Sequence, residues 1–377
     1  MKAQALARSG LEFALHKIEI EVDANPTTWR QAFTSNLESS PITLGPGTFT
    51  WVIKDPTNNM SDNPLDPFTV IATGRTNSTA YKLSIEMKTG PANTPLNCLK
   101  SAIISELMNF QSCTLNSAQK IQANDKTWAT GSSQINADVN AVTGIKGVGY
   151  NGANRTGVTP YDMPGSSVYD YYIKQGTSID YASIPFSTLQ NLVISPANNP
   201  FGTTNTEGIY VINCNSNDLI ITKCRIVGTL VIQNARTVYI SDEVTWEPAY
   251  PNYPALLTNG MLHFQQNNRR LNESDANANF NPIGTPWKGQ AEIDKGDDYP
   301  NVIAGLIYVD DNIWVAADAD VTLEGVLVST HAFEMDDHSS LTILYRDTYF
   351  NNPPPGFCQP IGGPPRPIPG SLQRVIN

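Results

Sequence analysis

The sequence has few charged residues and no cluster of basic ones. Only 16% of the 377 residues are Asp, Glu, Lys or Arg, and the formal net charge is −11. Proteins that bind nucleic acids gather Lys and Arg to contact phosphates, so this composition argues against that class. The chain as given also lacks a run of about 18 apolar residues, which a membrane-spanning helix needs, and it shows no secretory signal peptide.

Cysteine and histidine are scarce as well, and their spacing is not that of a zinc site. The four His are scattered, and no two of the five Cys have the close spacing that zinc ligation requires. Cys98 and Cys113 are near enough in sequence for a local disulfide if the protein is exported. Cys214 and Cys224 lie in predicted strands, where we expect buried thiols.

Gly, Pro, Asn, Ser and Thr are abundant instead, which favours strands, turns and long loops. The main pattern is a 20-residue repeat, in which Gly305–Glu324 aligns with Gly325–Leu344. Trp314 aligns with Glu334 between the apolar pairs, and both side chains are expected to point outward. The aligned apolar pairs are Ile307 with Leu327, Ile313 with Phe333, Val315 with Met335, Val321 with Leu341 and Leu323 with Ile343.

The same period occurs earlier, where Gly208–Val227 aligns with Gly228–Glu247. A coil of three short strands cannot bury its inward face alone, whereas stacked coils do. A meander of antiparallel hairpins is the alternative, because a short apolar run does not reveal its partner. The blocks lack the Asn-Gly and Asp-Gly turns of tight hairpins, so we predict a three-sided parallel β-helix, or β-solenoid, that is right-handed. The aligned pairs here are Tyr210 with Leu230, Ile212 with Ile232, Ile220 with Ile240, Cys224 with Val244 and Ile226 with Trp246.

The rest of the chain predicts a mainly β protein with a helix at its start. Ala and Leu are dense in the first 36 residues and favour helix. Alternating apolar residues over 41–88 predict a small antiparallel sheet, and helical spacing over Leu96–Gln119 predicts a helix between head and solenoid. The predicted parts are a helix over 1–36, a small α+β head over 37–125, lead-in loops with a first irregular coil over 126–200, the solenoid over 201–350 with an inserted loop over 247–301, and a Pro-rich tail over 351–377. The tail is expected to cover an open end of the solenoid or to hang free.

The helical string ALARSGLEFALHKI, Ala5–Ile18, resembles the segment just past the membrane span in pilin-like proteins of type IV pili and type II secretion systems. The strand that ends in ATGR, followed by a strand with Tyr81, resembles the PilX-like pilus-assembly proteins. This resemblance covers about the first 90 residues. It implies a protein of the cell envelope, on its periplasmic or extracellular face, that is anchored in the inner membrane before assembly by a half-helix preceding Met1. It also implies contact with other pilin-like subunits through an assembly helix that includes Leu6, Gly10, Leu11, Phe13 and Leu15.

Catalytic chemistry has little support in the sequence. Glycoside hydrolases on β-helices place two carboxylates on one face, but the doublets Asp297–Asp298, Asp310–Asp311 and Asp336–Asp337 do not share a register. We therefore predict neither catalytic residues nor a bound cofactor. Asp294, Asp297 and Asp298 form a candidate calcium site, because they offer hard oxygen ligands on one loop, although they lack the EF-hand pattern.

These features together predict a non-enzymatic pilin-like structural subunit of a type IV pilus, pseudopilus-type filament or secretion apparatus. Its solenoid would serve surface interaction or adhesion, with surface glycans as one class of partner. Two alternatives stay open. One is a carbohydrate-active parallel β-helix enzyme, either a polysaccharide lyase or a hydrolase, and the other is a free-standing extracellular adhesin or surface module.

Overall fold

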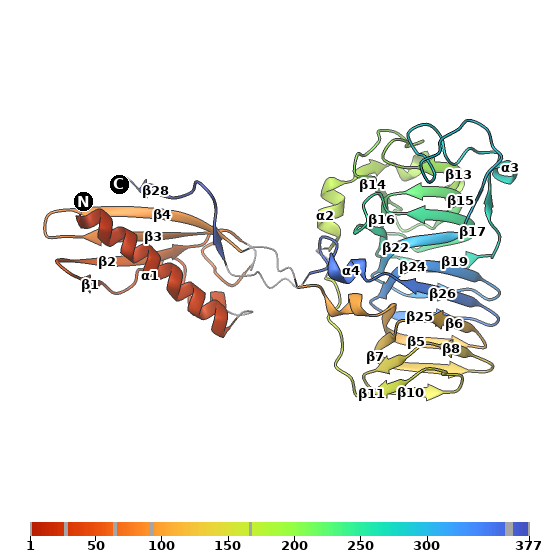
Figure 1. Ribbon diagram of the computed structural model, residues 1–377, viewed down its shortest axis with the longest axis horizontal. Coiled ribbons are helices and arrows are strands. Elements are labelled where there is room, and N and C mark those ends of the chain that lie inside the picture. The colour runs from red at the N-terminus through yellow and green to blue at the C-terminus, as the bar shows by residue number, and fades with distance from the viewer. Residues whose placement is uncertain are drawn as a thin grey trace. The chain divides into compact units, whose positions relative to one another are not determined.

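The structure is a computed structural model and describes residues 2–25, 29–62, 66–89, 94–165, 168–358 and 365–375. The chain forms two compact units (Figure 1). We call Met1–Thr94 with Cys358–Asn377 the head unit, and Pro95–Phe357 the stack unit. The described part is mainly β, with a long helix at its start. It contains no helix that is both long and apolar enough to cross a bilayer.

Helix α1 (Lys2–Ala24) packs on the antiparallel sheet of the head unit (Figure 1). The predicted helix over 1–36 is thus observed as α1 and a short 3-10 turn, η1 (Trp29–Ala32). A Cβ atom at Gly74 in the sheet would lie 2.2 Å from the Ala3 carbonyl oxygen and 2.3 Å from the Ala7 nitrogen, so glycine is needed where helix and strand meet. The buried residues of α1 recur every three or four positions and form one apolar stripe: Ala3, Leu6, Ala7, Leu11, Ala14, Ile18 and Val22.

The head sheet has the strand order β1-β2-β3-β4-β27, and β28 also pairs with β4. The expectation that the Pro-rich tail covers the solenoid or hangs free is wrong, because β27 and β28 belong to that tail. Strand β4 has an edge that β3 leaves unpaired, and the tail donates and accepts hydrogen bonds there. The strands are β1 (Ile42–Leu44), β2 (Gly47–Lys54), β3 (Phe68–Arg75), β4 (Ala80–Lys88), β27 (Arg366–Pro367) and β28 (Gln373–Val375).

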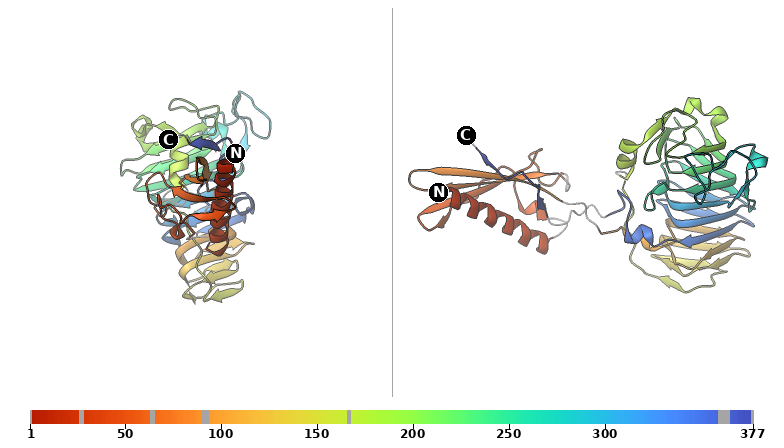
Figure 2. Two further views of the ribbon diagram at one scale, coloured as in Figure 1. Left: turned by 90° about the vertical axis from the view of Figure 1, so that its left-hand side faces the viewer. Right: turned by 45° about the horizontal axis from the view of Figure 1, so that its top comes forward.

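The stack unit holds one continuous sheet of twenty strands, which pair in parallel. The predicted register is confirmed at Gly305, which pairs with Gly325, and at Ile313, which pairs with Phe333. The alternative of antiparallel hairpins is therefore wrong for these coils. Figure 2 shows that each coil lies on the next. The inward side chains of successive coils therefore form one apolar core.

One predicted register is off by a residue. Ile240 pairs with Ile221 and not with Ile220, whereas Cys224 pairs with Val244 as predicted. The sheet shifts its register between these two pairs, because one strand has a single residue there, Lys223, where its neighbour has two.

The chain enters the stack in its middle. Strand β5 (Ile103–Gln111) pairs with β24 and β25, which come more than 200 residues later, so the first coil lies beside the last. The coils from β5 to β11 extend in one direction, and the chain then returns along α2 (Val168–Gln175) to begin β12 at the other end (Figure 1). The predicted helix over Leu96–Gln119 is wrong. In β5, Met108 and Phe110 are buried whereas Asn109 and Gln111 are exposed, and this alternation is the period of a strand.

The inserted loop is shorter than predicted. Strands β18 and β19 continue the coils within 247–301, and the chain leaves the stack over 267–301, which we call the excursion loop. The loop contains β20 (Leu271–Asn272), α3 (Glu273–Ala276) and β21 (Asp298–Tyr299). The strands of the first part of the stack are β6 (Thr114–Ser117), β7 (Ile121–Thr130), β8 (Gln134–Asn136), β9 (Val139–Ala141), β10 (Gly144–Gly147) and β11 (Asn154–Thr156).

The remaining strands run from the far end of the stack back to β5. Short helical turns accompany them: η2 (Asn97–Lys100), η3 (Tyr181–Ser183), η4 (Pro185–Ser187) and α4 (Thr348–Asn351). The strands are β12 (Thr177–Ile179), β13 (Thr188–Ile194), β14 (Ile209–Asn213), β15 (Leu219–Val227), β16 (Thr229–Gln233), β17 (Thr237–Glu247), β18 (Pro254–Thr258), β19 (Met261–Gln266), β22 (Val302–Val309), β23 (Ile313–Val315), β24 (Asp320–Ser329), β25 (Ala332–Met335) and β26 (Ser340–Tyr345).

Candidate functional site

The face of α1 that turns away from the head sheet is polar. Leu6, Gly10 and Leu11, which the sequence assigned to subunit assembly, are buried against the sheet of their own head unit. Phe13 is half-buried, with its ring centroid 5.8 Å from that of Phe49 in β2, and Leu15 packs partly against the same core. The exposed side of the helix carries polar and charged residues instead. Arg8 forms an ion pair with Glu12, and Nδ1 of His16 lies 3.6 Å from a carboxylate oxygen of Glu19.

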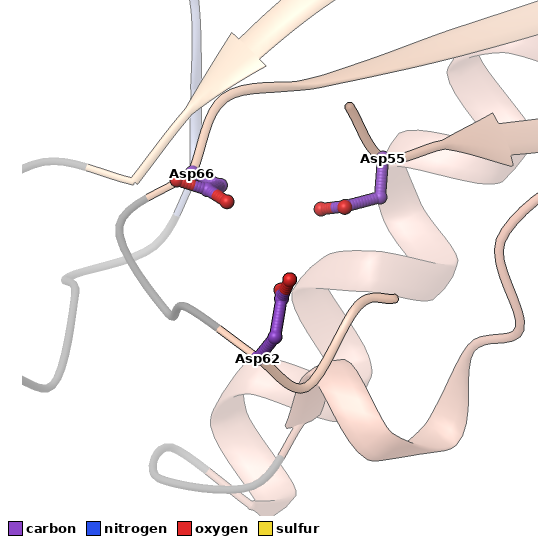
Figure 3. A group of neighbouring side chains, drawn as sticks. All are labelled: Asp55, Asp62 and Asp66. Carbon is purple, nitrogen blue, oxygen red and sulfur yellow. The ribbon is translucent and has the colours of Figure 1, made fainter. Parts of the chain in front are cut away.

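The head unit gathers three carboxylates that the sequence analysis did not single out. Asp55, Asp62 and Asp66 follow β2 and turn their side chains toward a common space (Figure 3). In the sequence, the signal for this group was the close spacing of oxygen-bearing side chains at positions 55, 57, 59 and 62. The Thr57 hydroxyl oxygen lies 2.7 Å from an oxygen of Asp55 and 2.5 Å from an oxygen of Asp62. Its single proton can be donated to one of these two carboxylates at a time.

A buried arginine already brings a positive charge to this group. Nη1 of Arg30 lies 3.5 Å from Oδ2 of Asp55, and both side chains are almost wholly inaccessible to water. Nη2 of Arg30 donates to the carbonyl of Asp66, and the guanidinium packs over the rings of Trp29 and Phe68. Burial lowers the pKa of Arg30, and the neighbouring carboxylates oppose that shift. Arg30 therefore acts as the internal cation that holds this acidic loop against the head core.

The stack unit carries a continuous line of outward side chains, one from each of seven coils, which we call the outer row. Register pairs connect its members from one end to the other. The His263 ring lies between those of Tyr239 and Trp314, with centroids 5.3 and 5.1 Å apart. Burial lowers the pKa of His263, although Asp336 opposes the shift. The outer row consists of Tyr239, His263, Trp314, Glu334, Asn109, Trp128 and Lys146.

A shallow hollow of about 290 Å³ lies beside the outer row, where Trp128 is 53% exposed. Glu334 and Asp336 line it together with amide and hydroxyl groups from β5 and β7. The Asn109 amide donates to Glu334 over 3.3 Å. An exposed indole beside carboxylates and amides combines an apolar face with hydrogen-bonding groups. This combination suits a ligand that has both apolar faces and hydroxyl groups.

The excursion loop is held to the stack by a second buried arginine. Nη1 of Arg225 in β15 donates to the carbonyls of Phe280 and Thr285, each over 2.8 Å, and Nη2 donates to Pro286 over 2.9 Å. Nη2 also contacts Glu247 at 3.1 Å. The Arg225 side chain is only 2% exposed. Without it, these carbonyls would have little access to water as a replacement donor.

The same loop contains a second group of carboxylates, and it differs from the predicted calcium ligands. Only Asp297 of the predicted three belongs to it; its partners are Glu273 and Glu292. Asp294 instead accepts a hydrogen bond from the Gly296 nitrogen, and Asp298 accepts one from Asn272. A hydrogen bond with Asp297 raises the pKa of Glu292.

The predicted disulfide is not formed. All five cysteines are free thiols, and four of them are buried. Cys98 packs in the cluster beneath α2, whereas Cys113 lies in the core enclosed by the coils, so a layer of the sheet separates their surroundings. Burial raises the pKa of Cys113 to about 11 and that of Cys224 to about 12. The expected buried thiols at Cys214 and Cys224 are confirmed.

Comparisons with known proteins give distant likenesses. No protein-family model and no curated protein matches the sequence. The competence-associated pilin ComZ from Thermus thermophilus is 10% identical, with 100% of this chain and 98% of that chain covered and a TM-score of 0.33. An ice-binding protein from an Antarctic biological consortium is 11% identical, with coverage of 68% and 93% and a TM-score of 0.34. The DUF3494 domain of an ice-binding protein from Shewanella frigidimarina is 12% identical, with coverage of 67% and 97% and a TM-score of 0.25. At TM-scores this low, the residues of this chain have to carry the functional argument.

Proposed function

We propose that the protein is a non-enzymatic pilin-like subunit of a type IV pilus, pseudopilus-type filament or secretion apparatus. The head unit is its mount and the stack unit is its display platform. The connectivity of the head sheet carries this proposal: β4 and β27 are neighbours in that sheet, and the whole stack unit lies between them in sequence. The head sheet is therefore complete without any strand from the stack unit, and each unit can serve its own task.

The mount consists of α1 and the sheet beneath it. In this proposal the subunit is anchored in the inner membrane before assembly. Other pilin-like subunits then contact the exposed charged side of α1 and its half-buried Phe13 and Leu15, since Leu6, Gly10 and Leu11 already pack on the head sheet. A PilX-like role in pilus assembly is the specific form that the sequence resemblance favours.

The platform is a three-sided, right-handed solenoid that presents the outer row on the cell surface. Surface glycans are the proposed ligand, because Trp128 can stack on the apolar face of a sugar while Glu334 and Asp336 accept hydrogen bonds from its hydroxyls. The Trp128→Ala variant should lose at least tenfold in affinity for the oligosaccharide that binds best in a panel of soluble glycans. Phe186→Ala removes an aromatic ring that is 97% exposed and lies outside the outer row, so it is the matched control. Equal loss in both variants would contradict this assignment.

The subunit role is tested in the native cell. The complete gene, with an epitope tag in the exposed segment around Phe186, should yield protein in the filament fraction that shearing releases, and immunogold should label those filaments. Recovery of all the tagged protein as a free secreted species would overturn the filament role and support a free-standing adhesin.

A carbohydrate-active enzyme is the second candidate, and the two carboxylates beside Trp128 favour it. Such an enzyme would use one as acid and the other as base or nucleophile. The purified chain is incubated with polysaccharides, and newly formed reducing ends are measured. Release that disappears in Glu334→Gln would establish the enzyme, whereas binding without release supports a display surface.

A further inference from the structure

The excursion loop brings together three carboxylates from separate parts of its length. Glu273 begins α3, Asp297 precedes β21, and Glu292 lies in the segment between them. One oxygen from each lies within 4.8 Å of the others. Because Glu273 and Asp297 are 24 residues apart, the fold and not local composition assembles this group.

The carboxylate at the centre of the group is buried. Glu273 is 0% exposed and accepts hydrogen bonds from the Phe280 nitrogen (2.6 Å), the Tyr299 hydroxyl (2.9 Å) and the Asp297 nitrogen (3.1 Å). These donors hold the carboxylate in one orientation, but they are neutral groups. Among the described residues, none of the three carboxylates forms an ion pair with Lys, Arg or His. Lys295, in the same loop, donates instead to Asn277.

A buried amide that points into this group provides a second, independent observation. Asn281 is 1% exposed, and its Nδ2 lies 3.3 Å from Oε1 of Glu292 and 3.2 Å from Oδ2 of Asp297. Its Oδ1 is buried without a hydrogen-bond partner, which is unfavourable. The two ends of an amide have nearly the same shape, so half a turn would place Oδ1 among the carboxylates. A cation there would make that orientation favourable.

The donor set identifies the class of ion. All four side chains offer hard oxygen atoms, and no sulfur or imidazole nitrogen is among them. Ca²⁺ takes six to eight such ligands in flexible geometry and is held by loops of this kind. We propose that Glu273, Asn281, Glu292 and Asp297 form a calcium site that joins the beginning and the end of the excursion loop. This inference does not depend on the proposed function.

Calcium binding to the full chain is measured by calorimetric titration with CaCl₂ after dialysis against EDTA, with thermal unfolding as a second readout. One Ca²⁺ should bind with a dissociation constant no weaker than about 10⁻⁴–10⁻³ M, the range of extracellular modules, and should raise the unfolding temperature. Glu292→Gln and Asp297→Asn should each weaken binding at least tenfold. Calcium should also protect the loop from trypsin cleavage after Lys288 and Lys295.

Two controls separate this site from other acidic groups. Asp294→Asn removes a carboxylate from the same loop but from outside the site, and Asp62→Asn alters the acidic group of the head unit. Both should bind calcium like the wild type. The proposal is overturned if no binding is observed, if binding survives Glu292→Gln combined with Asp297→Asn, or if Asp62→Asn alone abolishes it.

Discussion

Two buried arginines hold irregular loops to the regular parts of this molecule. Arg30 joins the acidic loop after β2 to the head core, and Arg225 joins the excursion loop to the coils. In both cases most acceptors are backbone carbonyls or carboxylates that water does not reach. A guanidinium suits this task because it carries five donors in a fixed plane and stays protonated.

Replacing Arg225 should release the excursion loop. Arg225→Met keeps much of the side-chain volume but leaves the carbonyls of Phe280, Thr285 and Pro286 without their donor. Leaving a buried acceptor without its donor costs about 1–3 kcal/mol of unfolding free energy. Urea unfolding gives that cost, and trypsin digestion at Lys288 and Lys295 reports the release.

The matched control is Arg236→Met, which removes an exposed ion pair with Asp218. It should leave stability and cleavage nearly unchanged, because exposed pairs contribute little. Similar effects of the two substitutions would show that charge loss, and not the carbonyl network, explains the Arg225 result.

His263 should make the stack unit less stable in acid. Burial lowers its pKa in the folded chain, whereas the unfolded chain has a value of about 6.5. The unfolded state therefore binds the proton more readily, and the contribution to stability is lost as the pH falls from about 6.5 through the lower folded pKa. His263→Phe keeps a ring between Tyr239 and Trp314 without a titrating group.

The measurement is the unfolding temperature of both proteins between pH 8 and pH 5. The wild type should lose more stability than His263→Phe over this range. Parallel curves would show that His263 does not contribute, since the carboxylates titrate equally in both proteins.

At the scale of single residues, the sequence revealed which residue types are present but not which residues lie together in the fold. Asp297 could be named as a candidate calcium ligand because it lies in an acidic segment. Glu273 could not, because it lies 24 residues earlier and is buried by contacts that only the folded loop provides. The assembly helix shows the converse: Leu6 and Leu11 have the right spacing for a contact face, and the head sheet already occupies that face.

At the scale of elements, stacked glycines fix the separation of neighbouring coils. A Cβ atom on Gly325 would lie 1.9 Å from the carbonyl oxygen of Gly305, and one on Gly228 would lie 2.2 Å from that of Gly208. These positions are the two glycine pairs that the 20-residue repeat predicts. They stack because a bulkier residue would separate the backbones of adjacent coils.

Gly325→Ala should therefore destabilise the stack unit. The added methyl group meets backbone atoms and not a flexible side chain. The loss of unfolding free energy should therefore reach or exceed the cost of overpacking, which is usually about 1–3 kcal/mol. Gly144→Ala in β10 is the matched control, because no atom lies within 4 Å of its added Cβ. Urea unfolding measures the free energy of unfolding of both variants. Equal values for the two variants would contradict the role of the glycine pair.

The repeat predicted the coils from Gly208 onward but not the coils of β5–β11. The reason is physical: Leu99, Ile103 and Leu107 are four residues apart, which fits a helix as well as an irregular strand. The order of the coils was also hidden, because parallel pairing of β5 with β24 joins segments far apart in sequence. Local periodicity identifies a coil, and it does not identify the coil's neighbour.

At the scale of the whole molecule, the head unit is completed by the end of the chain. Ser371 Oγ accepts a hydrogen bond from the Glu86 nitrogen over 3.1 Å, and the Ile368 nitrogen donates to the Glu86 carbonyl over 2.8 Å. The guanidinium of Arg374 lies 4.9 Å from the centroid of the Tyr81 ring. The head sheet can therefore reach its final form only after the whole stack unit has been synthesised.

Removal of 358–377 should destabilise the head unit and leave the stack unit unchanged, because the stack ends at Phe357 and both described strands of the tail pair with β4 of the head. Calorimetry of the full chain should show two transitions, and truncation should lower the temperature of only one of them, that of the head unit. The uncovered edge of β4 should also promote self-association, visible as a larger species in size-exclusion chromatography. If truncation lowers both transitions equally, the two units do not unfold independently, and the division into mount and platform fails.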